Sequence, residues 1–162
     1  MRAVVQRVTE GSVTIDGKIH SRIGKGFVIL LGIRKGDTRD RAISMAERCS
    51  NLRLFQDAEG KMNLALKEVD GSVLVVSQFT LYGDTRKGNR PGFSEAAPAV
   101  EAEPLYDEFV EQMSSRIGRN NVMTGVFRAM MQVAIVNDGP VTVILEEENS
   151  DANEIKKRSE KP

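Results

Sequence analysis

The sequence has few of the residues that usually carry out catalysis or bind metal ions. Its 162 residues include one cysteine, Cys49, and one histidine, His20. A lone cysteine forms no disulfide within the chain, and one residue of each kind cannot assemble the usual zinc sites. His20 falls in a predicted surface hairpin, which argues against a Ser-His-Asp or Cys-His mechanism. We therefore expect no metal, no cofactor and, for a hydrolase, a nucleophile activated by something other than histidine.

The sequence also lacks an excess of either charge and any long apolar run. Lysine and arginine total 23, and aspartate and glutamate also total 23. Without a positive excess, any contact with nucleic acid must be local. The longest apolar run, Phe27 to Leu31, is too short to span a bilayer, and residues 1–7 contain no apolar signal segment. We expect no membrane partner, no DNA partner and a reducing, cytoplasmic setting.

Short apolar segments predict a protein rich in β-strands. Strands are expected at residues 3–9, 12–15, 18–23, 27–33, 52–55, 73–76, 122–123, 129–136 and 141–145. Asp16-Gly17 suits the tight turn of a hairpin between the second and third of these. Residues 27–33 are apolar without alternation, which is typical of a central strand covered on both faces.

Two segments show helical spacing instead. Asp37 or Thr38 can cap a helix that runs to about Cys49, and a second helix is expected from Ala102 to Ile117. Strands and helices alternate unevenly along the chain. This favours a mixed sheet with the helices on one side over a regular doubly wound fold.

The C-terminal end differs in composition from the rest of the chain. Its residues are mostly charged or small and polar, with too few apolar side chains to form a core. We predict one domain at residues 1–146 and a charged, disordered tail at residues 147–162.

The most informative segment is SQFTLYGDTRKGNRPGF, which begins at Ser77 where a buried strand is expected to end. Ser77 and Thr80 offer hydroxyls, Gln78 offers an amide, and the main-chain N–H groups around Phe79 and Thr80 could face a developing oxyanion. A simpler interpretation is that the hydroxyls satisfy backbone groups at the strand end. Residue types alone favour the simpler interpretation.

Two further features allow a functional and a structural interpretation. Arg86, Lys87 and Arg90 form a cationic loop that could receive a phosphate chain or could simply be solvated. Neither a P-loop nor a dinucleotide-binding motif is present, which disfavours ATP and NAD. Gly139-Pro140 could hold a cis peptide bond that turns two carbonyls the same way, or could be an ordinary hairpin turn.

Three segments match one protein family in the same order. They read MRAVVQRVTEGSVTIDG at residues 1–17, VSQFTLYGDTRKGNRP at 76–91 and VNDGPVT at 136–142. On these segments the chain resembles the D-aminoacyl-tRNA deacylases, also called D-tyrosyl-tRNA deacylases, over residues 1–146. The family's Ser-Gln-Phe-Thr motif is complete from Ser77 to Thr80, and its Gly-cisPro motif matches Gly139-Pro140. Arg128 stands where the family commonly has glycine.

The resemblance implies a fold, an assembly and a reaction. The fold would be α/β, a compact single-domain sandwich of mixed β-sheets with two main helices packed on one face. The protein would be a homodimer that hydrolyses the ester of D-aminoacyl-tRNA, and of glycyl-tRNA mischarged on tRNA(Ala). Gly139 and Pro140 would enter the partner's pocket and exclude L side chains, a barrier that glycine escapes because it has no side chain.

The resemblance also assigns roles to residues. The catalytic group would be Ser77, Gln78, Phe79 and Thr80, with main-chain N–H groups of Phe79 and Thr80 holding the oxyanion and the ribose 2′-hydroxyl assisting water. The tRNA acceptor end would contact Arg86, Lys87 and Arg90. Three alternatives stay open: an esterase with Thr80 as nucleophile, an RNA-binding module without catalysis, and an esterase for small free esters.

Overall fold

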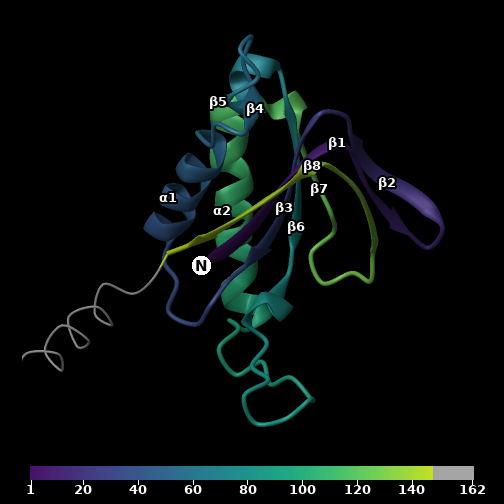
Figure 1. The fold of residues 1–162 in the computed structure, drawn as a ribbon. Helices are drawn as coiled ribbons and strands as arrows, with labels where there is room; N and C mark the ends of the chain where they lie inside the picture. The colour runs from purple at the N-terminus through teal and green to yellow at the C-terminus, as the bar shows by residue number, and fades with distance from the viewer. Residues whose placement is uncertain (148–162) are drawn as a thin grey trace, which may run out of the picture.

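The structure, a computed structural model, describes residues 1–147, so residues 148–162 of the predicted tail lie outside it. The described part forms a six-stranded mixed sheet with two long helices and a small two-stranded ribbon (Figure 1). The sheet strands are β1 (Arg2–Ile15), β2 (Lys18–Ile23), β3 (Gly26–Gly32), β6 (Ser72–Ser77), β7 (Val122–Thr124) and β8 (Gln132–Glu146). Their order is β2-β1-β3-β6-β7, and β8 pairs with β1. β6 runs parallel to β3 and β7, and the other pairs are antiparallel.

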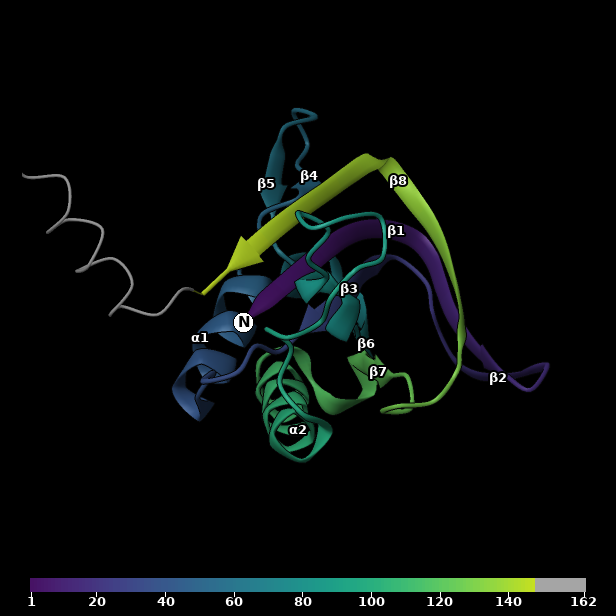
Figure 2. The ribbon, with the colours of Figure 1, turned by 90° about the horizontal axis from the view of Figure 1, so that it is seen from below.

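Both long helices pack on the same side of the sheet (Figure 2). They are α1 (Arg39–Ser50) and α2 (Ala99–Ile117). The apolar residues that recur at helical spacing in α1 are all buried: Ala42, Met45, Ala46 and Cys49. The predicted α/β class, a mixed sheet with two main helices on one face, is confirmed.

β3 is apolar along its whole length because each face of the strand contacts a core. Phe27, Ile29 and Leu31 belong to the main core, which the two helices cover. Val28 points the other way, into a second cluster that side chains of β8 help to cover. The continuous apolar run therefore identified a central strand correctly.

Two segments differ locally from the sequence prediction. The segments predicted at residues 3–9 and 12–15 form one continuous strand, β1. The strand predicted at residues 52–55 is wrong, because only β4 (Phe55–Gln56) forms there and pairs with β5 (Met62–Leu64). The carbonyl of Leu54 instead accepts a hydrogen bond from Arg7 Nη1 at 2.6 Å, so a side chain takes the place of a strand partner.

Of the two interpretations left open for Gly139-Pro140, the ordinary hairpin turn is wrong. The strands predicted on either side of it form one strand, β8, and both halves run antiparallel to β1 in a single direction. Gln6 pairs with Thr142 and Val8 pairs with Asn137, so four residues of β8 stand opposite Arg7 alone. Residues 138–141 therefore form a bulge in a continuous strand, and we call them the β8 bulge.

Asp37 ties the start of β1 to the start of α1. Its side chain is 1% exposed and lies 2.7 Å from the Met1 amino group. The same carboxylate accepts the N–H of Arg34 at 2.7 Å and Arg41 Nη1 at 3.2 Å. Burial lowers the pKa of the Met1 amino group, and the Asp37 carboxylate opposes that shift.

Replacing Asp37 by alanine is expected to lower the free energy of unfolding by about 3 kcal/mol, because buried cationic groups lose their partner. The measurement is urea unfolding of the variant against the parent. Asp40→Ala is the matched control, since Asp40 is exposed in the first turn of α1 and its replacement should cost about 0.5 kcal/mol. Equal unfolding midpoints for the two variants would contradict this account.

Candidate functional site

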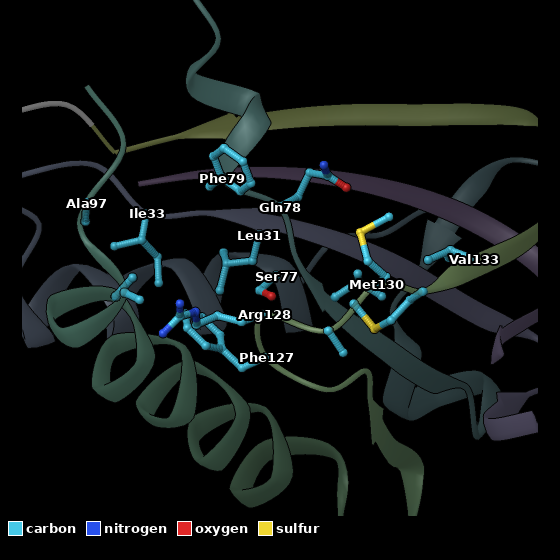
Figure 3. Close-up of a pocket in the computed structure, with 15 residues that line it drawn as sticks. Leu31, Ile33, Ser77, Gln78, Phe79, Ala97, Phe127, Arg128, Met130 and Val133 are labelled. Atoms are coloured by element: carbon cyan, nitrogen blue, oxygen red, sulfur yellow. The ribbon is translucent and has the colours of Figure 1, made fainter. Parts of the chain in front are cut away.

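A pocket of about 460 Å³ opens where β3 and β6 end side by side (Figure 3). Parallel strands that end at one edge of a sheet commonly provide such a site. The lining residues come from these strand ends, from the start of α2 and from the segment before β8: Leu31, Ile33, Val76, Ser77, Gln78, Phe79, Ala97, Ala99, Ala102, Phe127, Arg128, Ala129, Met130, Met131 and Val133. Most are apolar, so the polar groups among them stand out.

The Ser-Gln-Phe-Thr segment turns sharply at the end of β6. The Gln78 N–H donates to the Leu31 carbonyl at 2.8 Å, which holds the turn against β3. A short 3-10 helix, Phe79–Tyr82, follows. Neither the Phe79 N–H nor the Thr80 N–H donates to a backbone carbonyl within residues 1–147, because each opens that helix. Two main-chain donors therefore remain available in this segment, one on Phe79, which lines the pocket, and one on the residue after it.

The side chains of this segment are divided between the pocket and its surroundings. Ser77, Gln78 and Phe79 line the pocket, whereas Thr80 does not. The Thr80 hydroxyl accepts a hydrogen bond from the Gln78 amide nitrogen. Phe79 is 57% exposed and meets Phe93 edge to face, with ring centroids 5.0 Å apart. The structure thus brings together three of the four predicted catalytic residues.

The pocket wall between residues 127 and 133 was not predicted from the sequence. Phe127 packs against the ring of Tyr106 from α2, with centroids 5.7 Å apart. The Tyr106 hydroxyl donates to the Val75 carbonyl at 2.9 Å, and burial raises the pKa of that hydroxyl. The departure from the family at Arg128 was the one sequence signal in this wall.

Gly139 and Pro140 lie in the β8 bulge and do not line the pocket of their own chain. Their peptide bond is cis. Gly139 has a φ of +130°, and a Cβ added there would stand 2.7 Å from Val141 Cγ2 and 3.0 Å from Arg7 Nη2. Only glycine fits this position without a shift of the bulge.

Arg7 holds the β8 bulge in place through contacts with Asp138. Its side chain is 9% exposed, and its Nε donates to the Asp138 carbonyl at 3.1 Å and lies 3.3 Å from the Asp138 carboxylate. Its Nη1 donates to the Leu54 carbonyl. Asn137 closes the base of the bulge by accepting the Val141 N–H at 2.9 Å. Arg7 is therefore a partner of carbonyl groups and not a solvent-facing residue of β1.

The predicted cationic loop projects past the start of α2 (Figure 1). Arg86 is paired with Asp84, with Nη2 2.7 Å from the carboxylate, and this contact lowers the pKa of Asp84 to about 2. Lys87 and Arg90 are exposed and make no ion pair with any residue of the described chain. Two of the three predicted tRNA-binding residues thus present an uncommitted charge.

Residues 1–147 hold neither a cluster of metal-binding side chains nor a membrane-spanning helix. No group of three or more His, Cys, Asp and Glu side chains is placed to hold a metal ion. No helix in that range is long and apolar enough to cross a membrane.

An apolar pocket at the ends of parallel strands, with a few polar groups and main-chain donors at its edge, is the arrangement of an α/β enzyme. The family model described as D-Tyr-tRNA(Tyr) deacylase matches residues 4–146. The chain belongs to this deacylase family, and it is accordingly a hydrolase.

Individual relatives agree with this assignment. The D-aminoacyl-tRNA deacylase of Chlorobaculum tepidum is 56% identical over 146 residues, which cover 90% of this chain and 97% of that protein. The D-aminoacyl-tRNA deacylase of Porphyromonas gingivalis is 51% identical over 151 residues, covering 93% of this chain and 100% of that one. The match thus extends over nearly the whole length of both relatives.

Solved structures share the fold. That of a c-Myc DNA Unwinding Element Binding Protein has a TM-score of 0.87 at 43% identity and covers 92% of this chain and 100% of its own. That of a probable eukaryotic D-amino acid tRNA deacylase has a TM-score of 0.74 at 18% identity and covers 89% of this chain and 97% of its own. The second likeness bears on the fold alone.

Proposed function

We propose that the protein is a cytoplasmic tRNA-editing esterase, which hydrolyses D-aminoacyl-tRNA and mischarged glycyl-tRNA(Ala) and rejects L-aminoacyl-tRNA. The observation that carries the proposal is the complete Ser-Gln-Phe-Thr turn beside the pocket, with two main-chain N–H groups that have no backbone acceptor within residues 1–147. Residues 1–146 would form the catalytic domain, and residues 147–162 a tail outside it.

The mechanism fits a site without histidine. An aminoacyl ester is already activated, so the protein needs chiefly to orient it and to stabilise the negative charge on its carbonyl oxygen. The N–H groups of Phe79 and Thr80 supply that stabilisation, and the ribose 2′-hydroxyl of the substrate positions the attacking water. Ser77 and Gln78 shape the pocket around the ester.

Chirality would be read by a second subunit. The β8 bulge is exposed, and Arg7 and Asn137 hold it in one conformation. Because the bulge does not line its own pocket, a homodimer in which it enters the partner's pocket gives it a role. There the Gly139 and Pro140 carbonyls accept the substrate amino group, and the space for an L side chain is filled.

The tRNA acceptor end would follow the cationic loop. Lys87 and Arg90 have exposed charges without a protein partner in the described chain, which suits contact with phosphates. Arg86 would join them by exchanging its contact with Asp84 for a phosphate.

The deciding experiment compares hydrolysis of D-, L- and glycyl-tRNA by the purified protein. We expect rapid turnover of the D and glycyl esters and none of the L ester. Binding of tRNA without turnover would instead favour the RNA-binding module. Hydrolysis of free amino acid esters, or undiminished turnover of a tRNA that ends in 2′-deoxyadenosine, would favour the small-ester esterase.

Replacing Thr80 by alanine separates the two catalytic alternatives. If main-chain groups carry the chemistry, the variant should keep kcat within about tenfold of the parent, because its N–H is unchanged. Loss of a covalent nucleophile would cost on the order of a millionfold. Single-turnover hydrolysis of D-tyrosyl-tRNA measures the difference, with circular dichroism as the check on folding. Complete loss of hydrolysis in a folded variant would make Thr80 the nucleophile.

A further inference from the structure

Arg128 has a backbone conformation that arginine rarely adopts. Its φ is 64°, in the left-handed region, where glycine is at ease and residues with a Cβ are strained. Strain of this kind persists where it serves a function or where the surroundings impose it. At an exposed loop position such as this one, glycine or asparagine would meet the backbone requirement at lower cost.

The side chain of Arg128 places a positive charge in the wall of a pocket that is otherwise lined by uncharged residues. Arg128 is the one ionisable residue among those that line the pocket within the described chain. It is exposed and forms no ion pair or hydrogen bond with any residue from 1 to 147. Figure 3 shows its nitrogen atoms on the side of the pocket where α2 begins. An uncompensated guanidinium therefore faces the space that the substrate enters.

The N-terminus of α2 adds to the positive character of the pocket. Ala99, the first residue of α2, also lines the pocket, and no side chain of the described residues caps that end of the helix. A helix N-terminus carries a partial positive charge, so it does not stabilise a neighbouring guanidinium but attracts an anion. Glu101 lies in the first turn of α2 but does not line the pocket. Both features favour an anionic group between them.

We propose that Arg128 binds a backbone phosphate close to the 3′ end of the aminoacyl-tRNA and so positions the ester in the pocket. The proposal rests on the proposed function, since it takes aminoacyl-tRNA as the substrate. Every tRNA presents phosphates near its terminal adenosine, whatever amino acid it carries, and a guanidinium matches a phosphate with two parallel hydrogen bonds. The fold bears the cost of the strained backbone at residue 128, and the contact with substrate gives that strain a function. Arg128 is a positioning residue and takes no part in bond breaking.

The test uses the variants Arg128→Gly and Arg128→Asn, because glycine and asparagine tolerate a left-handed φ. On D-tyrosyl-tRNA we expect KM to rise about tenfold and kcat to change by less than about twofold. The plot of log(kcat/KM) against log salt should become shallower by about 0.7, as for one lost phosphate contact on a single strand. D-tyrosyl-adenosine, which has no phosphate, should be hydrolysed equally by parent and variants. Arg119→Ala, which removes an exposed arginine paired with Glu111, is the matched control and should behave as the parent.

Three results would overturn the proposal. The first is an unchanged KM and salt dependence in Arg128→Asn. The second is an equal loss on D-tyrosyl-adenosine, which would place Arg128 at the adenosine or the ester. The third is a loss confined to D-aspartyl and D-glutamyl esters, which would make Arg128 the partner of a substrate side chain. Binding of an RNA hairpin that ends in CCA and carries no amino acid tests the phosphate contact separately from the proposed function. If the parent hydrolyses no D ester, the proposed function fails. Weaker binding of the hairpin by the variants would still support the phosphate contact.

Discussion

Replacing Gly139 by alanine is expected to reduce hydrolysis of D-aminoacyl-tRNA by about a hundredfold and to weaken the rejection of L-aminoacyl-tRNA. The new Cβ would lie 2.7 Å from Val141 Cγ2, and the φ of +130° is one that L residues rarely adopt. The β8 bulge must therefore shift, and with it the two carbonyls that would receive the substrate amino group. The measurement is the rate of hydrolysis of matched D- and L-tyrosyl-tRNA by parent and variant.

Gly17→Ala is the control for the strain itself. Gly17 also has a positive φ, +75°, but it lies in the hairpin between β1 and β2 with open space around it. We expect this variant to lose about 1 kcal/mol of stability and to keep both the D rate and the L rejection of the parent. If Gly139→Ala also kept the parent's rate on the D ester and its rejection of the L ester, chirality would be read outside the β8 bulge.

Arg7→Leu is expected to have the second large effect, on stability and chirality together. The guanidinium is nearly buried and donates to the carbonyls of Leu54 and Asp138, which come from separate parts of the chain. Leucine leaves both carbonyls without this donor, so the free energy of unfolding should fall by about 3 kcal/mol. The bulge loses its support at the same time, and discrimination between D- and L-tyrosyl-tRNA should fall with it.

Two further variants show which part of Arg7 matters. Arg7→Lys keeps the charge but has no planar fork to reach two carbonyls, so it should recover only part of the loss. Asp138→Asn removes the carboxylate and keeps the carbonyl. Because that carboxylate is 48% exposed, this change should cost less than about 1 kcal/mol. Faster amide hydrogen exchange in residues 137–142 of Arg7→Leu alone would agree with this account, and unchanged exchange would contradict it.

The sequence was sufficient where local pattern and tertiary environment agree. The spacing of Ala42, Met45 and Cys49 marked the buried face of α1, and the unbroken apolar run of residues 27–33 marked a strand with a core on each side. The same holds for the Ser-Gln-Phe-Thr segment, since the end of a buried strand is a position that periodicity can locate.

The sequence misled where a distant partner decides the local structure. Asn-Asp-Gly-Pro is typical of a turn, and nothing nearby reveals that β1 is long enough to pair with the residues on both sides of it. The local sequence predicts a strand at Leu54, but its carbonyl accepts a hydrogen bond from Arg7, 47 positions away along the chain. The left-handed conformation at Arg128 is likewise set by the course of the chain between β7 and β8 and has no local signature.

The pairing of β1 with β8 also bears on how the chain is synthesised. Arg2 is paired with Glu146, so β1, which is synthesised well before β8, waits for β8 before one of its edges is covered. At the usual pace of translation this wait is about 10 to 30 seconds. Throughout it, β1 offers an unpaired edge with a valine-rich sequence, the kind of edge that joins other nascent chains. The yield of folded protein should therefore depend more on chaperones and on the rate of elongation than its final stability would suggest.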